Sequence, residues 1–555
     1  MKQRKGIRDL GLGKSLNGLL FIIFLLFNSL SVFANADSTA RKVVYTSMED
    51  ALANSSEVYQ LILARQDFEY LPDGILKLPN LEDLTLSECE FLKLSDAVEK
   101  LSSLKNLKRL DLVYGEYSKL PQNISKLSNL EVLILRGNHL KNLPASMSSM
   151  TKLKEISLSH NGSIKLDTAM MVLSSLPSLT KLDLSWCNQF EISDLIGECS
   201  ALEELDLSSN NFETLPASIS QLENLRSINF NGNFPMNHKK VFELLATLPA
   251  LEELNLSECK LDTLGPEISF LSHVKILDLS KNKIHLLDEN FGALINLEIL
   301  KLSNTSGGAK GNRLAELPGT FANLTNLKQL YLSGLGLNAL PEGFDQLTQL
   351  EILDLHQNNL FFFPGYLEPM KKLRILDLGM NQINLIPNWV GGYTELEQLN
   401  LEGDFLKTTE HNISEIPASF CNLTKLRVLS LENQNLPQLP ECFSALTNLE
   451  ELYLNGNGLI ELPKEFGKLS NLKVLYLKGN YLSALPASFS EMQNLENLDL
   501  SLSIALNWNM EAAKIAKLKS LQQLDMSYND VTVTHLKGIQ DALPDCYIIY
   551  VPYPH

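Results

Sequence analysis

The chain has 555 residues, a formal net charge of −18 and aromatic side chains at only 7% of its positions. Removal of residues 1–36, which hold five basic residues and one aspartate, takes the charge to −22. A protein with this much negative charge is repelled by phosphate backbones and by anionic lipid. Nucleic acid is therefore excluded as the expected partner.

The N-terminus has the order of a secretory signal. Basic residues up to Lys14 precede the apolar run 19–27, and the small residues Ala34 and Ala36 follow it. This order predicts a signal peptide over 1–36, cleaved after Ala36, with cleavage after Ala34 as the second choice. An uncleaved membrane anchor is the alternative, although the run is shorter than the ~20 residues that span a bilayer. We expect a protein that is secreted, held at the cell surface or kept in the periplasm.

Residues 37–57 are predicted to form an N-terminal helical cap. Thr46 and Glu49 have the spacing of a capping box, which favours a short helix over 46–53. A repetitive core exposes apolar surface at both ends, so a cap is expected at each of them. Residues 532–555 are the predicted C-terminal cap, with 546–551 (CYIIYV) as the last strand.

Residues 58–531 repeat the pattern L-x-x-L-x-L-x-x-N about twenty times, in units that are nearly all 23 or 26 residues long. Leucines at alternate places point one way on a short strand, and one unit cannot bury its apolar face alone. Stacked units pair their strands in parallel and bury a continuous core. The pattern predicts an α/β repeat solenoid with a concave parallel sheet of about 20 strands.

Two kinds of return segment are expected on the convex side. The 23-residue units carry L-P-x-x-[FI], in which proline prevents a helix from continuing, so they predict extended or 3₁₀ structure. The 26-residue units carry helical patterns at 95–104, 169–179, 239–251 and 510–521. Two longer units hold insertions at 305–312 and 404–411, which predict loops on one edge of the solenoid. Such loops are either tolerated for structural reasons or form the rim of a binding site.

The seven cysteines show no C-x-x-C spacing, which counts against zinc. Cys89, Cys187 and Cys259 take the place of the ninth-position asparagine, whose amide is expected to bond the backbone of adjacent turns. We therefore interpret these three as structural. Cys421 and Cys442 lie in neighbouring repeats. The sequence allows two alternatives for them, a disulfide or two free thiols. The others are expected to be buried thiols.

The repeat pattern resembles the leucine-rich repeat family over 58–531, in particular the L-P-x-x-[FI] subtype and exported bacterial members. The resemblance implies a horseshoe-shaped solenoid whose concave face is commonly the binding surface.

Two sets of side chains are predicted to face the concave side. At the second position of each unit, acid and base alternate almost without error from Glu82 to Glu496, which favours one register of stacking. Aromatic residues at other exposed positions are candidate interface anchors, because they bury a large area at low entropic cost. The alternative is that tyrosines simply suit strands. The candidate binding residues are Tyr331, His356, Tyr453, Tyr476, Lys478, Tyr114, His160 and Trp186.

Motifs of catalysis are missing from the sequence, which has no H-E-x-x-H and no G-x-S-x-G. The sequence therefore predicts a non-enzymatic interaction module without cofactor or metal, expected to be a monomer that binds a protein partner on its concave face. One alternative is a cell-surface adhesin or glycan-binding protein. Another is a structural envelope protein without a specific ligand, since fold alone does not decide function.

Overall fold

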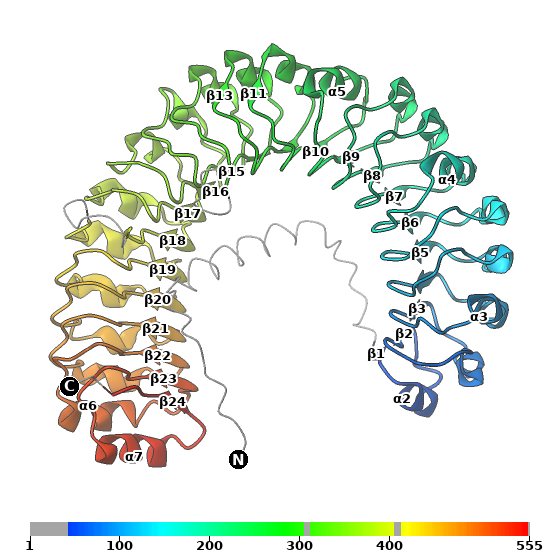
Figure 1. The fold of residues 1–555 in the computed structure, drawn as a ribbon. Helices are drawn as coiled ribbons and strands as arrows, with labels where there is room; N and C mark the ends of the chain where they lie inside the picture. Colours follow the sequence, from blue (N-terminus) through cyan, green and yellow to red (C-terminus); the bar gives the residue numbers. More distant parts are fainter. Residues whose placement is uncertain (1–42, 305–310, 405–411, 553–555) are drawn as a thin grey trace, which may run out of the picture.

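The computed structural model describes residues 43–304, 311–404 and 412–552, which form an open arch (Figure 1). Strands line the inner side of the arch, and helices and turns form its outer side. The predicted signal peptide lies outside the described residues, as does most of the two predicted loops at 305–312 and 404–411. Within the described ranges, no helix is long and apolar enough to cross a membrane.

A parallel sheet of 22 strands runs along the inner side and confirms the predicted sheet of about 20. Beyond the twenty repeat strands, β1 adds one at the N-terminal end and β24 adds one at the C-terminal end. The strands are β1 (Val44–Tyr45), β2 (Gln60–Ile62), β3 (Asp83–Thr85), β4 (Arg109–Asp111), β5 (Val132–Ile134), β6 (Glu155–Ser157), β7 (Lys181–Asp183), β8 (Glu204–Asp206), β9 (Ser227–Asn229), β10 (Glu253–Asn255), β12 (Ile276–Asp278), β14 (Ile299–Lys301), β15 (Gln329–Tyr331), β16 (Ile352–Asp354), β17 (Ile375–Asp377), β18 (Gln398–Asn400), β19 (Val428–Ser430), β20 (Glu451–Tyr453), β21 (Val474–Tyr476), β22 (Asn497–Asp499), β23 (Gln523–Asp525) and β24 (Tyr547–Ile549).

Alternation along each strand separates the core from the concave face. In β20 the leucine Leu452 is fully buried, whereas Glu451 and Tyr453 on either side of it face the concave side. Leu452 lies opposite Leu475 of β21, so the buried leucines of successive units stack in one row. Each of these side chains contributes about 1.5–3 kcal/mol by leaving water.

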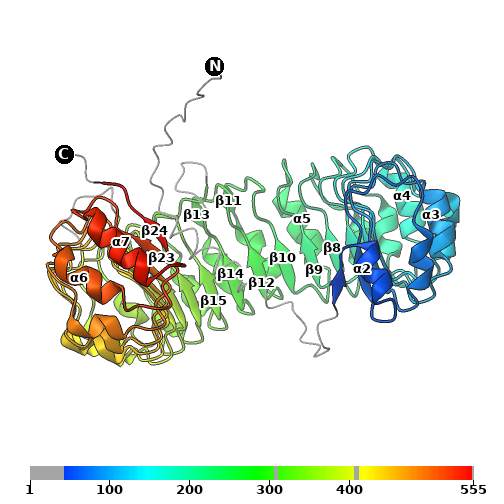
Figure 2. The same ribbon diagram turned by 90° about the horizontal axis from the view of Figure 1, so that it is seen from below.

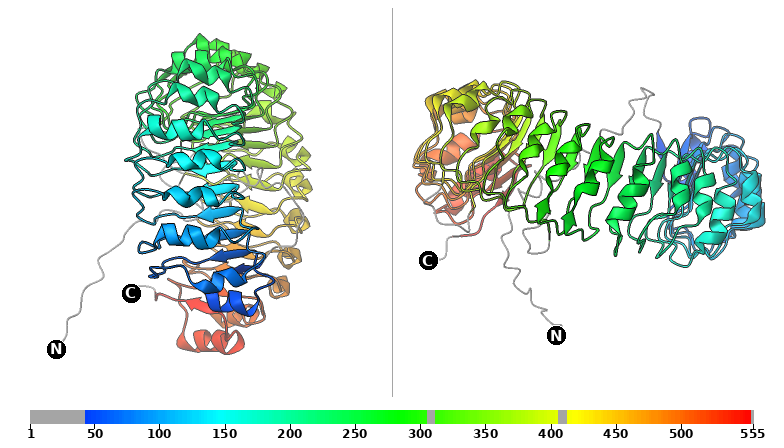
Figure 3. Two further views of the ribbon diagram at one scale, coloured as in Figure 1. Left: turned by 90° about the vertical axis from the view of Figure 1, so that its right-hand side faces the viewer. Right: turned by 90° about the horizontal axis from the view of Figure 1, so that it is seen from above.

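The return segments follow the predicted division. Three helices of 26-residue units lie on the outer side of the N-terminal half of the arch, as Figures 1 and 3 show, and a fourth lies near the C-terminus. These four are α3 (Leu94–Leu101), α4 (Leu166–Leu173), α5 (His238–Leu245) and α6 (Trp508–Ile515). The 23-residue units instead form 3₁₀ turns, such as η17 (Ala487–Glu491), which begins directly after Pro486.

The two ends differ in part from the predictions. At the N-terminus the helix α2 (Met48–Ala53) is present, but the Thr46/Glu49 capping box is wrong. Ser47 is the N-cap instead, and its Oγ accepts a hydrogen bond from the backbone N–H of Asp50 at 3.1 Å. At the C-terminus the predicted strand is β24. The helix α7 (Val533–Ala542), which packs beside α6 (Figure 2), was not predicted.

A second, two-stranded sheet was also not predicted. It pairs β11 (Thr263–Leu264) with β13 (Leu286–Leu287) and lies away from the concave sheet (Figure 1).

Ninth-position residues hold neighbouring units together. The Nδ2 atom of Asn210 donates to the carbonyl of Leu184 in the preceding unit at 2.9 Å, and its Oδ1 accepts the backbone N–H of Cys187 at 3.0 Å. Where cysteine replaces asparagine the contact persists, because the thiol of Cys187 donates to the carbonyl of Leu158 at 3.1 Å. The structural interpretation of these cysteines is confirmed.

A disulfide joins Cys421 to Cys442, which decides between the two alternatives left open by the sequence. It connects the 3₁₀ turns η14 (Ala418–Asn422) and η15 (Glu441–Ala445) of neighbouring units, with 5.9 Å between the two Cα atoms. The other five cysteines are free and buried, as expected.

Replacing both Cys421 and Cys442 by serine is expected to lower the free energy of unfolding by about 3 kcal/mol, because the bond closes a loop with a sequence separation of 21. Urea denaturation with and without reductant measures this difference. The reductant should destabilise the wild type and leave the double variant unchanged. A wild type that is indifferent to reductant would contradict the prediction.

Candidate functional site

Charged second-position side chains form a ladder along one border of the concave sheet. Ion pairs of 2.6 to 3.5 Å join adjacent units at Glu82–Lys108, Glu131–Lys154, Glu252–Lys275, Glu298–Lys328, Arg374–Glu397, Arg427–Glu450 and Glu450–Lys473. These contacts confirm the predicted cross-strand pairing. Because the side chains are largely exposed, each pair contributes at most about 1 kcal/mol, and the ladder matters more for register.

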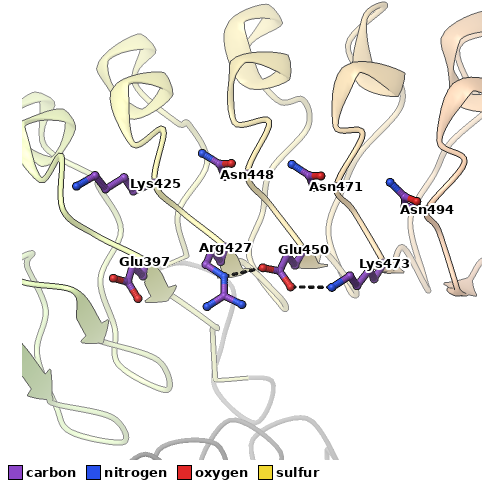
Figure 4. A pocket seen from close by; sticks show the side chains of 8 residues that line it. All are labelled: Glu397, Lys425, Arg427, Asn448, Glu450, Asn471, Lys473 and Asn494. Carbon is purple, nitrogen blue, oxygen red and sulfur yellow. Dashed lines mark hydrogen bonds and ion pairs between the residues drawn. The ribbon is translucent and has the colours of Figure 1, made fainter. Parts of the chain in front are cut away.

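A groove of about 600 Å³ runs beside this ladder (Figure 4). Its lining is Glu397, Lys425, Arg427, Asn448, Glu450, Asn471, Lys473 and Asn494. The Nδ2 atoms of the three asparagines donate to carbonyls of the preceding unit at 2.7 to 2.9 Å. The Glu450 carboxylate is held by Arg427 and Lys473, whose hydrogen bonds lower its pKa. Lys425 and Glu397 pair with Glu395 and Arg374, which lie outside the groove. Since every lining group already has a partner and none of the lining side chains is aromatic, we assign the groove to stability.

Tyr453 and Tyr476 lie side by side on the neighbouring strands β20 and β21, towards the C-terminal end of the concave sheet. Their rings meet edge to face, with 5.4 Å between centroids and 83° between planes, a favourable aromatic geometry. The Tyr453 hydroxyl donates to Glu451 Oε2 at 2.5 Å. Burial raises the pKa of both phenols, so both remain neutral at physiological pH. The exposed Lys478 follows two residues after Tyr476, and its backbone N–H bonds Asn455 Oδ1 at 2.8 Å.

Tyr331 and His356 make contacts within the protein. The Tyr331 hydroxyl donates to Gln329 Oε1 at 3.1 Å, and the Lys301 ammonium lies 5.9 Å from the ring centroid. His356 Nδ1 lies 3.2 Å from Asp377 Oδ1, and the histidine side chain is only 16% exposed. Both residues are therefore engaged in local contacts on the sheet.

Four buried polar residues, Asp354, Asp377, Asn400 and Glu402, surround the half-buried His356 and form a polar cluster with it. Close approach is possible because the neighbouring residue is Gly379. A Cβ atom there would lie 2.6 Å from Asn400 Nδ2 and 2.9 Å from His356 Nδ1. The cluster thus depends on a glycine at the seventh position of its unit.

The cluster has unusual proton affinities. Burial, followed by repulsion from Asp377, raises the pKa of Asp354. Burial and repulsion from Glu432 raise the pKa of Glu402 to about 7. Burial lowers the pKa of His356, but the carboxylates of Asp377, Asp354 and Glu402 together outweigh burial and bring it to about 9. The folded state therefore holds protons that an unfolded chain would release.

In the N-terminal part of the sheet, the turns that follow β4, β6 and β7 hold three candidate residues, Tyr114, His160 and Trp186. All three have left-handed backbones, with φ between 54° and 57°, a conformation that is uncommon for bulky residues. The His160 and Trp186 rings stack with 5.2 Å between centroids and 18° between planes. The Tyr114 ring covers Gly137, where a Cβ atom would lie 2.2 Å from it.

Comparison with models of known protein families identifies the family of this chain. Leucine-rich repeat models match residues 105–162, 128–190, 249–306 and 410–459, a two-copy model matches 447–490, and a single-repeat model matches 201–222. The chain is a leucine-rich repeat protein. No curated protein sequence matches it.

Solved structures place this leucine-rich repeat protein among long solenoids. It is similar to TLR13 in complex with ssRNA13, with 21% identity, 92% of this chain and 83% of that chain covered, and a TM-score of 0.57. A leucine-rich repeat protein of Leptospira interrogans is 25% identical, over 91% of this chain and 99% of that one, with a TM-score of 0.39. The similarity to TLR13 shows the shared fold.

In this leucine-rich repeat protein seven of the eight candidate residues fall into three groups, and Tyr114 lies apart with its ring over Gly137. Tyr453, Tyr476 and Lys478 lie together, His160 stacks on Trp186, and Tyr331 and His356 are held by neighbouring polar groups. Sequence reasoning did not find Glu402 or the asparagines at 448, 471 and 494. The asparagines have a visible signal, because each directly precedes the first leucine of its unit, and Asp354 belongs to a visible line of fifth-position aspartates, whereas Glu402 has no such signal. In the described part of the chain, no group of three or more metal-ligating side chains is placed to hold a metal ion.

Proposed function

We propose that this protein is an exported, non-enzymatic binding module whose concave sheet takes a protein partner at Tyr453 and Tyr476. The observation that carries the proposal is the edge-to-face tyrosine pair on the inner side of the arch. Neighbouring repeats share their buried leucines and ninth-position residues, but the fold does not require aromatic rings at adjacent concave positions. Tyrosine is among the commonest anchors of protein interfaces.

Export is supported by two independent features. The N-terminal 36 residues have the order of a cleaved secretory signal. The Cys421–Cys442 disulfide suits an oxidising compartment, because disulfides persist outside the cytosol and in the periplasm. These two features support our proposal that the protein is located in the periplasm, at the cell surface or outside the cell.

Site-specific photo-crosslinking in intact cells tests the binding site. A photoreactive amino acid at Lys478, next to the tyrosine pair, should yield a covalent adduct with one defined protein. The same amino acid at Met171, which is 67% exposed on the outer-side helix α4, should not. Adducts of equal yield and identity from both positions would count against a concave site.

Replacing Tyr453 and Tyr476 by alanine together should abolish the adduct at 478, because the loss of two interface anchors costs at least about 2 kcal/mol, or roughly 30-fold in Kd. The matched control is Tyr481→Ala, which removes a tyrosine that is 64% exposed but lies beyond the turn of the same unit. Purified protein and the identified partner then give the Kd of each variant. An unchanged Kd in the double variant would reject the site.

A further inference from the structure

A second pocket lies in the N-terminal half of the arch, far along the sheet from the tyrosine pair. It has a volume of about 410 Å³ and is formed by residues of β5 to β8 and the turns that follow them. Among the residues that line it are Arg136, Ser157, His160, Lys181, Asp183 and Trp186. We propose that this pocket binds a carbohydrate, with a sugar ring seated against the Trp186 indole.

The indole is a fixed platform. Trp186 is 57% exposed, although tryptophan is usually well buried in a folded protein. Its backbone is held by a hydrogen bond from its N–H to the Ser208 carbonyl at 3.0 Å, and His160 stacks against one face of its ring. The remaining area of the indole is open to a flat ligand. An exposed, immobilised aromatic face loses little entropy when an apolar ring face packs on it.

Polar groups around the platform are oriented before a ligand arrives. The Ser157 hydroxyl donates to Asp183 Oδ2 at 2.6 Å and the Ser185 hydroxyl donates to Oδ1 at 2.7 Å, which fixes the carboxylate. Lys181 is held by Glu204 at 2.7 Å. The pocket thus offers donors and acceptors close together, as a polyhydroxylated ligand requires, because each hydroxyl both donates and accepts.

The charges in the pocket favour a neutral ligand. Two cationic residues, Arg136 and Lys181, line the pocket together with three acidic ones, Glu155, Asp183 and Asp206, so both signs of charge are present. Burial and the nearby Arg136 lower the pKa of His160, which leaves the imidazole uncharged at pH 7. A lysine or arginine of a protein partner is the common alternative occupant of an exposed tryptophan face. Here a charged ligand of either sign would meet like charges as well as opposite ones, whereas an uncharged polyhydroxylated ligand meets no repulsion.

The size of the pocket agrees with this ligand class. Small-molecule sites are usually about 300–1,000 Å³ in volume, and this pocket lies near the lower end of that range. It has room for about one or two sugar rings. Tyr114 lies on the same line of turns, two units before His160, where a longer oligosaccharide would continue.

Tryptophan fluorescence and saturation-transfer NMR test the proposal with defined probes. The chain has three tryptophans, of which Trp508 is buried and Trp389 partly buried, so sugar-dependent changes report on Trp186. The probes are the methyl glycosides of glucose, galactose, mannose and N-acetylglucosamine, and their disaccharides. At least one should protect Trp186 from acrylamide quenching and receive saturation at one face of its ring.

Trp186→Ala should weaken that sugar at least about tenfold in Kd, while Trp186→Phe should retain part of the affinity. The matched control is Phe190→Ala, which removes an aromatic ring that is 66% exposed in the same unit but does not line the pocket. Circular dichroism and melting temperature verify folding of each variant. The tyrosine double variant should bind the sugar as the wild type does, which separates this proposal from the protein site. Absence of any protecting glycoside, or equal binding by Trp186→Ala, would overturn it.

Discussion

Replacing Asn210 by alanine is expected to destabilise the protein by about 3 kcal/mol or more. Its side chain is buried and makes five hydrogen bonds to the backbone. Oδ1 accepts the N–H groups of Cys187 and Gln189, and Nδ2 donates to the carbonyls of Leu184, Leu207 and Ser208, at 2.9 to 3.1 Å. The carbonyls of Leu207 and Ser208 keep a second donor each, but alanine leaves the N–H groups of Cys187 and Gln189 and the carbonyl of Leu184 without this partner. Each unsatisfied group costs about 1–3 kcal/mol.

Urea denaturation measures the stability, and hydrogen exchange at the amides of Cys187 and Gln189 locates the loss. The matched control is Asn211→Ala, the adjacent residue, whose side chain reaches only Asn188 at the surface and whose loss should change stability by less than about 0.5 kcal/mol. Asn210→Cys should be milder than Asn210→Ala, because cysteine already serves at this position in Cys187 and Cys259. Equal stability of the alanine variant and the control would refute the role given to this amide.

Stability is expected to fall as the pH rises, by roughly 5 kcal/mol between pH 6 and pH 9. The pKa values of Asp354 and Glu402 are raised on folding, so their contribution is lost as the pH rises from about 4 towards 7. The pKa of His356 is also raised, to about 9, so its contribution is present below about 6.5 and is lost as the pH rises through 9. All three shifts therefore have the same sign, and each group weakens folding by up to about 1.4 kcal/mol per pH unit.

Asp354→Asn isolates the carboxyl part of this effect. Asparagine keeps an oxygen that accepts the backbone N–H of His356, a bond of 2.9 Å in the wild type. The variant should be more stable than the wild type at pH 8 and show a shallower decline between pH 5 and pH 8 in urea denaturation. Asp345→Asn, at an exposed position on a 3₁₀ turn, is the control and should follow the wild-type curve. Parallel curves for all three proteins would show that the cluster does not titrate as described.

Much of the fold is predictable because the repeat fixes which side chain lies beside which. Leu452 and Leu475 occupy the same place in adjacent units, so their stacking follows from the pattern and a strand spacing of about 4.8 Å. The same reasoning places Cys187 where Asn210 lies one unit later. The helix α3 is distinguished from a 3₁₀ turn by its longer unit and by the lack of Leu-Pro.

Features that depend on one atom or one unit are not predictable in this way. Thr46 and Ser47 are equally suitable caps by residue type, and only the backbone geometry selects Ser47. The sheet of β11 and β13 arises in two units whose turns depart from Leu-Pro, a departure that does not by itself specify pairing.

In the candidate site, too, some features follow from position in the repeat and others depend on local packing. The sequence shows that His356 and Tyr453 face the concave side, because position in the unit decides that. It does not show that His356 is engaged by Asp377, since this depends on the space left by Gly379. Nor does it show that His160 and Trp186 stack, because ring orientation after a left-handed turn follows from packing between units.

The charge ladder has a consequence for how such a chain can change in length. Acid and base alternate from one unit to the next, as in Arg427, Glu450 and Lys473, so the electrostatic period of the solenoid is two units, although its structural period is one. Deletion or duplication of a single unit would set two like charges about 4.8 Å apart at the junction. Loss or gain of a pair of units would leave every neighbour opposite in sign. The smallest segment that the protein can exchange without an electrostatic defect is therefore a pair of repeats.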